Sequence, residues 1–393
     1  MCKSPIVIIG AGPSGLMAAQ HLAQNGFDVH IYEQNKAAAR KFLVAGHGGF
    51  NLTHNEPIEL FVNRYDKSIL HLIIQNFDNK ATINWLQDLG IETYVGSSGK
   101  IFPVKTIKPI QVLNAWLNRL NSLGVKIFYE HKFVDFNDKT VEIEERGQRK
   151  SIPYYKLLLA LGGGSWSKTG SNAKWVDILS NKGIDIIPLQ AANSGYETVE
   201  DFKNIEGQNL KNITVKFNDI SKKGELVFTN YGIEGSPIYY LNRFTRHTQF
   251  PYTIFIDLKP NLSEKEIITE LQKQTNTTKV LKEKLNISSV ALQLLKRLPK
   301  ESFVSPILLS QLIKNYPITV CNFRPIDEVI STAGGVSFDA IDTSLSLKKY
   351  PNIYCIGEML DWEAPTGGYL LQACFSLGVY TADAITKEPK NHK

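Results

Sequence analysis

Three glycines near the start of the chain are spaced as a phosphate-binding turn requires. Gly10, Gly12 and Gly15 follow the apolar run 5–9, which predicts a buried strand, and they open a predicted helix that Gly26 ends. The first glycine of such a turn makes a tight bend, and the second lets backbone N–H groups approach a pyrophosphate. The third lets the helix pack closely on the strand. The helix N-terminus adds partial positive charge for an anion.

An acidic residue stands where the ribose of a dinucleotide is normally bound. A second predicted strand, residues 28–32, leads directly to Glu33. A carboxylate at this place accepts hydrogen bonds from ribose hydroxyls, whereas an arginine would suit a 2′-phosphate. The sequence therefore predicts a dinucleotide site, although an ordinary tight turn is the alternative and the motif does not distinguish FAD from NAD. The candidate residues in this part are Gly10, Gly12, Pro13, Ser14, Gly15, Glu33 and Gln34.

A glycine-rich segment after Glu33 offers further ligand contacts. Residues 40–55 combine two basic residues with glycines and polar side chains, and we expect an irregular loop. The basic residues could meet phosphates, and the glycines would let backbone approach a flat ring. The alternative is an exposed loop with a solvated charge pair. The candidate residues here are Arg40, Lys41, Phe42, Gly49, Asn51 and Thr53.

Three later segments carry the same kind of signal. The apolar run 157–161 ends in Gly162, and the run 352–356 ends in Gly357 and Glu358. Strands that end in glycines are where a doubly wound sheet contacts its ligand, although a sharp turn is the alternative. Gly367 and Gly368 open a predicted helix that continues to about residue 385, which gives a second positive helix terminus.

The composition is that of a globular protein with two or three domains. The chain has 393 residues, of which 43% are hydrophobic and 21% are charged, and its net charge is +6. No apolar run is long enough to span a membrane and no signal peptide is recognisable, so we expect a cytoplasmic protein without a membrane partner. The four cysteines are scattered without a Cys-x-x-Cys pair, which predicts neither a metal site nor a disulfide framework.

The order of predicted elements changes twice along the chain. Alternating strands and helices stop near residue 190, and they return near residue 335. Between these points we expect a β-rich insert, residues 191–260 and 318–334, with a strand over 319–331. A helical subdomain occupies residues 261–317. Lysines 279, 282, 284, 296 and 300 with Arg297 make this subdomain basic, which is typical of a solvated face and leaves RNA binding as an alternative.

These motifs together resemble the BaiN-like (YhiN-like) flavoproteins, which share the two-part FAD site of glutathione-reductase-like proteins. The resemblance rests on the fingerprint with Glu33 and on the segments 40–54, 160–166, 228–235, 332–336, 357–361 and 366–369. Many members carry Gly-Arg-Cys-Asn where this chain has Gly49-Phe50-Asn51, so that a mechanism needing this cysteine does not apply. The Asn-Leu-Thr-His form at 51–54 indicates a separate branch.

The resemblance implies an α/β fold with a Rossmann-type FAD-binding domain, residues 1–190 and 335–393, into which the β-rich insert and the helical subdomain are placed. It implies that the fingerprint and Glu33 hold the ADP half of FAD. The remaining cofactor contacts implied are Lys41, Asn51, Thr53, Val134, Ala160, Leu161, Gly162, Gly357, Glu358, Gly367, Gly368, Tyr369 and Leu370.

The resemblance also implies an FAD-dependent oxidoreductase. Its members reduce conjugated carbon–carbon double bonds of small molecules, and one branch reduces uracil in ribosomal RNA to dihydrouridine. We expect a small-molecule substrate with NADH or NADPH as candidate electron donor; the alternatives are an RNA-modifying enzyme and a non-catalytic FAD-binding protein. The candidate proton donors are His47, His54 and Tyr369, although a single histidine in a polar loop is more often structural.

Overall fold

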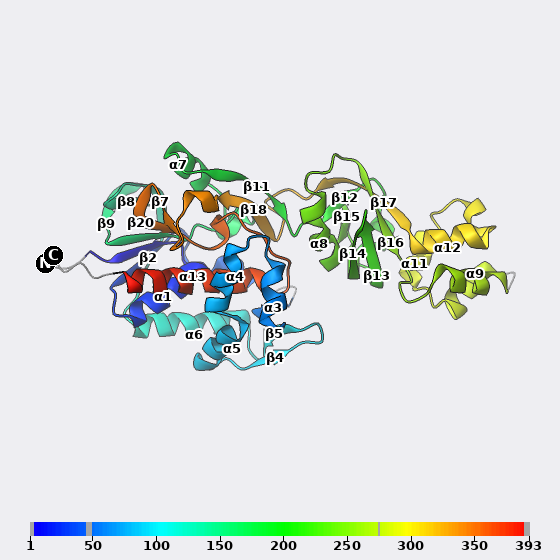
Figure 1. The fold of residues 1–393 in the computed structure, drawn as a ribbon, viewed down its shortest axis with the longest axis horizontal. Coiled ribbons are helices and arrows are strands. Elements are labelled where there is room, and N and C mark those ends of the chain that lie inside the picture. The colour runs from blue at the N-terminus through cyan, green and yellow to red at the C-terminus, as the bar shows by residue number, and fades with distance from the viewer. Residues whose placement is uncertain (1–3, 45–48, 274–275, 389–393) are drawn as a thin grey trace. The chain divides into compact units, whose positions relative to one another are not determined.

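The computed structural model describes residues 4–44, 49–273 and 276–388 (Figure 1). The chain divides into two compact units, residues 1–190 with 330–393, and residues 191–329. The first unit therefore resumes at Ile330, whereas we expected its return at residue 335. The reason is that β18 (Ser331–Val336) pairs with β11 (Ile186–Ala192) and so extends the first unit.

The first unit is built on a six-stranded sheet with the order β19-β20-β10-β1-β2-β6. Its strands run parallel except for the edge strand β19, and β1 lies between β2 and β10. Fully buried strands of a parallel sheet read as continuous apolar runs, which is why β1 and β10 are recognisable in the sequence. The strands are β1 (Ile6–Ile9), β2 (Val29–Glu33), β6 (Lys126–Tyr129), β10 (Lys156–Leu159), β19 (Ser346–Leu347) and β20 (Tyr350–Cys355).

Two smaller antiparallel sheets complete the strands of this unit. They are β3 (Thr53–His54), β5 (Lys100–Pro103) and β4 (Thr93–Val95), and β7 (His131–Phe136), β8 (Thr140–Glu145) and β9 (Gln148–Pro153). The helices are α1 (Pro13–Gln24), α2 (Arg40–Val44), α3 (Ile58–Phe61), α4 (Ile69–Asn76), α5 (Asn79–Asp88), α6 (Pro109–Ser122), α7 (Trp175–Asn181) and α13 (Tyr369–Lys387). The expectation of an irregular loop over residues 40–55 is wrong at its start, because Arg40–Val44 form the short helix α2 with Phe42 buried beneath it.

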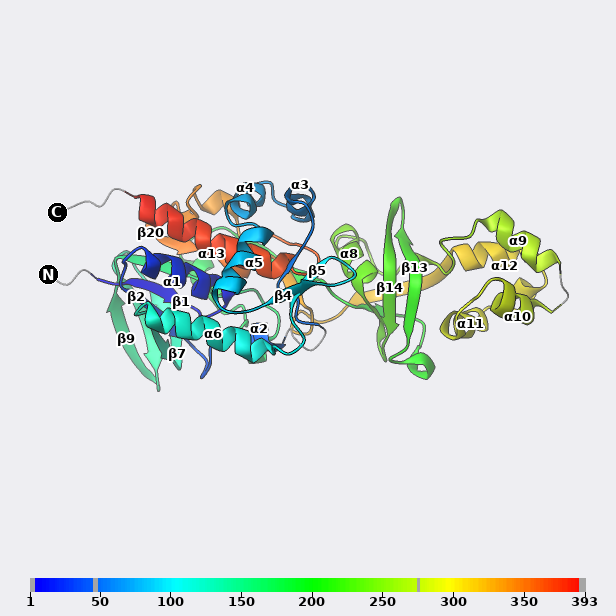
Figure 2. The same ribbon diagram turned by 90° about the horizontal axis from the view of Figure 1, so that it is seen from below.

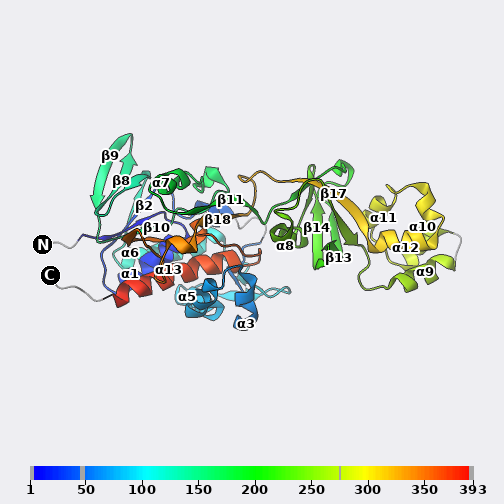
Figure 3. The same ribbon diagram turned by 45° about the horizontal axis from the view of Figure 1, so that its top comes forward.

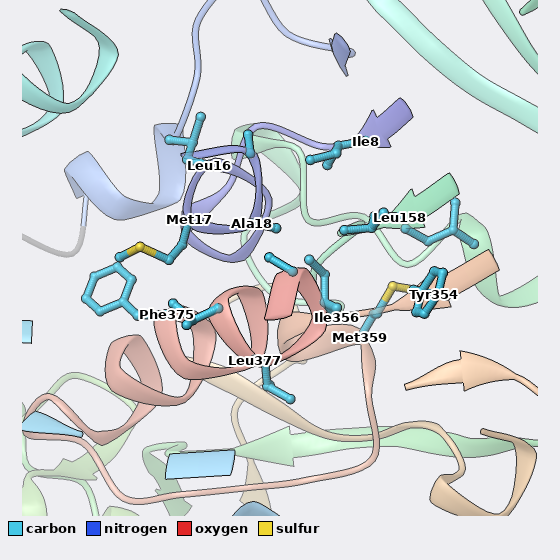
Figure 4. Close-up of a cluster of buried hydrophobic side chains, with 14 of the residues drawn as sticks. Ile8, Leu16, Met17, Ala18, Leu158, Tyr354, Ile356, Met359, Phe375 and Leu377 are labelled. Carbon is cyan, nitrogen blue, oxygen red and sulfur yellow. The ribbon is translucent and has the colours of Figure 1, made fainter. Parts of the chain in front are cut away.

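The core of the first unit lies between the parallel sheet and the paired helices α1 and α13, which run side by side (Figure 2). Met17 of α1 lies beside Phe375 of α13, and Ile8 and Leu158 lie on the strands of the sheet next to them (Figure 4). The two helices approach closely at Gly378, where an added Cβ would lie 2.6 Å from the Ser14 carbonyl oxygen. This contact fixes α13 against the first turn of α1.

The second unit is a closed barrel with short helices inserted between its later strands (Figure 3). The strand order is β12 (Tyr196–Thr198), β15 (Gly232–Glu234), β14 (Ile220–Phe228), β13 (Asn209–Phe217), β16 (Tyr252–Asp257) and β17 (Tyr316–Phe323). The helices are α8 (Ser236–Thr245), α9 (Glu264–Gln272), α10 (Thr277–Lys279), α11 (Ser289–Leu295) and α12 (Pro306–Lys314), with a π-helical turn over Val280–Lys284.

The single strand expected over residues 319–331 is wrong. The chain leaves the barrel after Phe323, and the next strand, β18, begins only at Ser331 in the first unit. Pro325 lies in the connection, where its ring removes a backbone donor that a continuing strand would need.

We predict that Gly378→Ala destabilises the protein although alanine is the better helix former. Alanine normally stabilises a helix interior by about 1 kcal/mol relative to glycine. Here the added methyl group meets the backbone of α1, and such overpacking costs about 1–3 kcal/mol. Urea unfolding of the FAD-free protein measures the difference, with Ala384→Gly on the same helix as the control for propensity alone. Stabilisation by Gly378→Ala would contradict the close approach of α1 and α13.

Candidate functional site

The turn between β1 and α1 depends on two glycines for steric reasons. Gly10 has φ +104°, and a Cβ there would lie 2.3 Å from the Ala160 carbonyl oxygen of the neighbouring strand end. A Cβ on Gly15 would lie 2.1 Å from the Gly10 carbonyl oxygen. Larger residues at these two positions would therefore push α1 away from the carboxyl ends of β1 and β10.

The N-terminus of α1 is open on the side that faces away from these contacts. Gly12 is the N-cap residue, no side chain caps the helix, and a Cβ on Gly12 would meet no atom within 4 Å. The Ser14 hydroxyl is buried without a hydrogen-bond partner among the described residues. The positive end of this twelve-residue helix therefore offers free N–H donors, a hydroxyl without a partner and empty space. These are the features of an anion-binding site.

Glu33 is held at the end of β2 by backbone donors. Its Oε2 accepts a hydrogen bond from the Ala11 N–H at 2.9 Å, and its Oε1 accepts from the Asn35 N–H at 2.9 Å and from Asn35 Nδ2 at 2.7 Å. The side chain is 8% exposed. Asn35 Oδ1 in turn accepts from the Arg40 guanidinium at 3.0 Å. The carboxylate is therefore fixed in orientation beside the α1 terminus, with lone pairs left for further donors.

A second charged group joins α2 to the end of β20. Lys41 Nζ lies 2.9 Å from Glu358 Oε2 and donates to Ser165 Oγ at 2.8 Å. Glu358 Oε1 also accepts from the Thr332 N–H at 3.2 Å. Residues that lie 317 positions apart in the sequence thus form one partly buried ion pair. The pair stands beside Gly357, where a Cβ would lie 2.6 Å from Ser14 Oγ.

These groups line one continuous cavity at the carboxyl ends of the parallel strands. Of the residues that the sequence singled out, those lining it are Gly10, Gly12, Pro13, Ser14, Glu33, Gln34, Arg40, Lys41, Phe42, Ala160, Leu161, Gly162, Gly357 and Glu358. Gly15, Gly49, Asn51, Thr53, Val134, Gly367, Gly368, Tyr369 and Leu370 lie outside it.

Sequence reasoning missed one wall of the cavity. Lys132 and Phe133 line it where we expected Val134, which falls at the register irregularity of β7 between Phe133 and Asp135. Trp175 also lines the cavity, and its Nε1 donates to the Gly162 carbonyl at 2.9 Å. Tyr32, Asn35, His131 and Ser171 are further lining residues. The strand β7 carries no ligand-binding motif in the sequence, and Trp175 follows an irregular segment.

Apart from Gly15 in α1 and Val134 in β7, the residues outside the cavity gather at the N-terminus of α13. Gly368 has φ +102°, and a Cβ there would lie 2.5 Å from the Thr53 backbone. The Asn51 side-chain amide lies 2.5 Å from the Gly368 N–H and 3.1 Å from the Gly49 carbonyl. Thr53 Oγ1 donates to Gln372 Oε1 at 2.7 Å in the first turn of α13. The loop before β3 and the start of α13 are therefore one unit of structure.

Two of the three candidate proton donors lie together beside this terminus. The His54 and Tyr369 rings stack with centroids 5.2 Å apart. Tyr369 donates to Glu56 Oε2 at 2.9 Å, and Arg64 also donates to Glu56. The Arg64 hydrogen bond lowers the pKa of Glu56, whereas burial raises the pKa of Tyr369.

His54 donates from Nε2 to the Ser98 carbonyl at 2.9 Å, so that Nδ1, which has no partner among the described residues, carries no proton. Burial lowers the pKa of His54. Glu56 and Arg64 were not singled out from the sequence, because neither stands in a recognisable motif. His47 lies outside the described residues.

Comparison with known proteins identifies the family. The model of the HI0933-like protein Rossmann domain matches residues 4–384. The chain belongs to the HI0933-like family. Members of this family are FAD-dependent oxidoreductases. The expected Rossmann-type FAD-binding fold is thereby confirmed.

Two relatives match over nearly their whole length. A ribosomal RNA dihydrouridine synthase of Haemophilus influenzae is 23% identical over 97% of this chain and 98% of its own. A 3-dehydro-bile acid delta(4,6)-reductase of Clostridium scindens is 24% identical over 98% of this chain and 99% of its own.

Solved structures show the same fold. A flavocytochrome c3 fumarate reductase matches 98% of this chain and 78% of its own with TM-score 0.55 and 11% identity. A 3-ketosteroid-delta4-(5alpha)-dehydrogenase from Rhodococcus jostii RHA1 matches 98% of this chain and 97% of its own with TM-score 0.53 and 13% identity.

The residues of the cavity fit FAD. The uncapped α1 terminus with the unpartnered Ser14 hydroxyl suits a diphosphate, and Glu33 beside it suits ribose hydroxyls. Over the described ranges no cluster of three or more histidine, cysteine or acidic side chains could hold a metal ion. Within the same ranges no helix is both long and apolar enough to cross a membrane.

We predict that Gly12→Ala and Gly10→Ala separate binding from folding. Alanine at position 12 meets no protein atom and keeps an allowed φ of −80°, so the free energy of unfolding of the FAD-free protein changes by less than about 0.5 kcal/mol. The methyl group occupies the anion place, so the Kd for FAD rises at least tenfold, about 1.4 kcal/mol. Gly10→Ala instead destabilises the FAD-free protein by more than about 1 kcal/mol.

Urea unfolding and flavin fluorescence quenching measure the two effects separately. Unchanged FAD affinity in Gly12→Ala would show that the diphosphate is not bound at the α1 terminus.

Proposed function

We propose that this protein is an FAD-dependent reductase of a conjugated carbon–carbon double bond in a small molecule. The observation that carries the proposal is the match, over almost the whole chain, to two relatives whose names both denote reduction of a carbon–carbon double bond, in one case in a small molecule. A delta(4,6)-reductase saturates ring double bonds, and dihydrouridine is uridine with one ring double bond reduced. In both cases a hydride and a proton add across an alkene that is activated by a carbonyl group.

We propose the following roles for the chain's own residues. The α1 terminus and Ser14 bind the diphosphate, and Glu33 binds the adenosine ribose. The Lys41–Glu358 ion pair would lie beside the ribityl chain. FAD, when bound, supplies the hydride chemistry. The N-terminus of α13 would stabilise negative charge on the pyrimidine edge of the ring system.

The proposed proton donors are Tyr369 and His54. Tyr369 and His54 remain candidates because they lie at the α13 terminus. Both hydrogens are engaged, by Glu56 and by the Ser98 carbonyl respectively, so either residue would have to exchange that bond for one to the substrate. As electron donor we propose NADH or NADPH that binds transiently, because the sequence carries a single dinucleotide fingerprint.

We do not propose RNA as the substrate. The case for RNA in this chain is the basic helical subdomain, and its lysines 279, 282, 284, 296 and 300 are exposed. Arg297 is engaged within its own unit, where it donates to the Asp201 carbonyl and stacks over Phe202. Exposed lysines on a helical surface are typical of a solvated face.

We predict that anaerobic addition of NADH or NADPH bleaches the flavin absorbance of the FAD-loaded protein. Re-oxidation by a cyclic enone then restores the absorbance with one equivalent of saturated ketone formed. Unstructured RNA serves as the parallel acceptor, and a salt series serves as the control for RNA binding, which would weaken steeply with salt.

Two outcomes would overturn the proposal. Flavin that dithionite reduces but that no enone re-oxidises would exclude a C=C reductase of this class. Re-oxidation by uracil-containing RNA and not by any enone would assign the reaction to RNA.

A further inference from the structure

The turn at Gly99-Lys100 has no role in the site described so far. Lys100 is the first residue of β5 and stands opposite His54 of β3 in the antiparallel pair. Gly99 has φ +80°, and a Cβ there would lie 2.6 Å from the His54 ring. The turn is therefore packed tightly enough to fix where the Lys100 side chain starts.

The stem of Lys100 crosses the loop that leads into α13. A Cβ on Gly367 would lie 3.5 Å from Lys100 Cε, so that the aliphatic chain covers this glycine one residue before the Gly368 N-cap. The side chain is partly buried. A lysine whose stem is packed in this way presents its ammonium group at a defined place.

The charge of Lys100 is not compensated by its neighbours. Within the described ranges its Nζ makes neither a hydrogen bond nor an ion pair. The nearby carboxylate, Glu56, is already bound by Arg64 and Tyr369, and the charges of Glu56 and Arg64 cancel. Burial favours the neutral form of His54, and the positive charges of Arg64 and Lys100 also lower its pKa. Among Glu56, Arg64, His54 and Lys100, the charge of Lys100 is therefore the one left uncompensated.

We propose that Lys100 is a flavin-tuning residue: its ammonium group faces the pyrimidine edge of the bound FAD and stabilises the negative charge of the reduced flavin. The inference rests on the placement of the α13 terminus in the proposed function. A cation near N1 and C2=O of the ring raises the reduction potential, because negative charge collects there on reduction. The charge of Lys100 adds to the partial positive charge of the helix terminus.

The test compares Lys100→Met and Lys100→Gln with Lys100→Arg, and uses Lys105→Met as control because Lys105 is exposed in the following loop. Two quantities are measured on FAD-loaded protein: the Kd for sulfite, which adds to the oxidised flavin and places negative charge at the same edge, and the midpoint potential. We expect both neutral variants to weaken sulfite binding at least tenfold. We also expect the equilibrium constant for two-electron reduction to fall tenfold, which lowers the midpoint potential by about 30 mV.

In Lys100→Arg we expect the sulfite Kd and the equilibrium constant for two-electron reduction to stay within threefold of the values of the unchanged protein. Lys105→Met changes neither quantity. Unchanged sulfite binding and potential in either neutral variant that retains FAD would overturn the inference. Loss of FAD from both neutral variants, with Lys100→Arg still loaded, would also overturn it, because the charge would then serve binding. Neither measurement uses an acceptor or a nicotinamide, so failure of the proposed reaction leaves this test intact.

Discussion

The close approach of three backbone segments is the constraint on which the first unit depends. The end of β1, the first turn of α1 and the end of β10 meet at Gly10, Gly15 and Ala160, where two absent side chains leave room for carbonyl oxygens. Because the contacts are between backbone atoms, no rearrangement of side chains can relieve a substitution there. The same close packing directs the free N–H groups of α1 toward the cavity. It therefore both requires the glycines and orients the donors that bind the ligand.

The far end of the chain is tied to this centre by packing and by charge. Gly378 lets α13 lie against the first turn of α1, and Gly357 brings the end of β20 beside Ser14. The Lys41–Glu358 pair adds a polar link between α2 and the same strand end. An ion pair of this exposure contributes little to stability by itself, and its value here is the orientation that it gives to both groups. Residues from both ends of the sequence thereby form one cavity.

The parts of the site that the sequence predicted are those where backbone geometry restricts the residue type. Gly10, Gly12 and Glu33 stand in a spacing that few other structures need, and the apolar strands β1 and β10 are buried on both faces. The sequence does not contain a comparable signal for Phe133, which lines the cavity from β7, a strand without a recognisable ligand-binding motif. Glu56 and Arg64 also escape prediction, because their pairing depends on a tertiary contact with Tyr369.

The return to the first unit illustrates the same limit. Residues on both sides of Pro325 favour a strand, but β17 closes the barrel whereas β18 pairs with β11. Local propensity is satisfied by either partner, and only the completed sheets decide which one is used. The Lys100 turn is similar, since its relation to Gly367 joins segments more than 260 positions apart in the sequence.

The most direct measurement of the central claim is a calorimetric titration of the FAD-free protein with FAD, FMN and ADP. If the diphosphate at the α1 terminus and the ribose at Glu33 provide the main anchor, FAD binds most tightly, ADP binds detectably, and FMN binds at least a hundredfold more weakly than FAD. FMN binding as tight as that of FAD, with no heat from ADP, would contradict the assignment of this cavity to the ADP half of the cofactor.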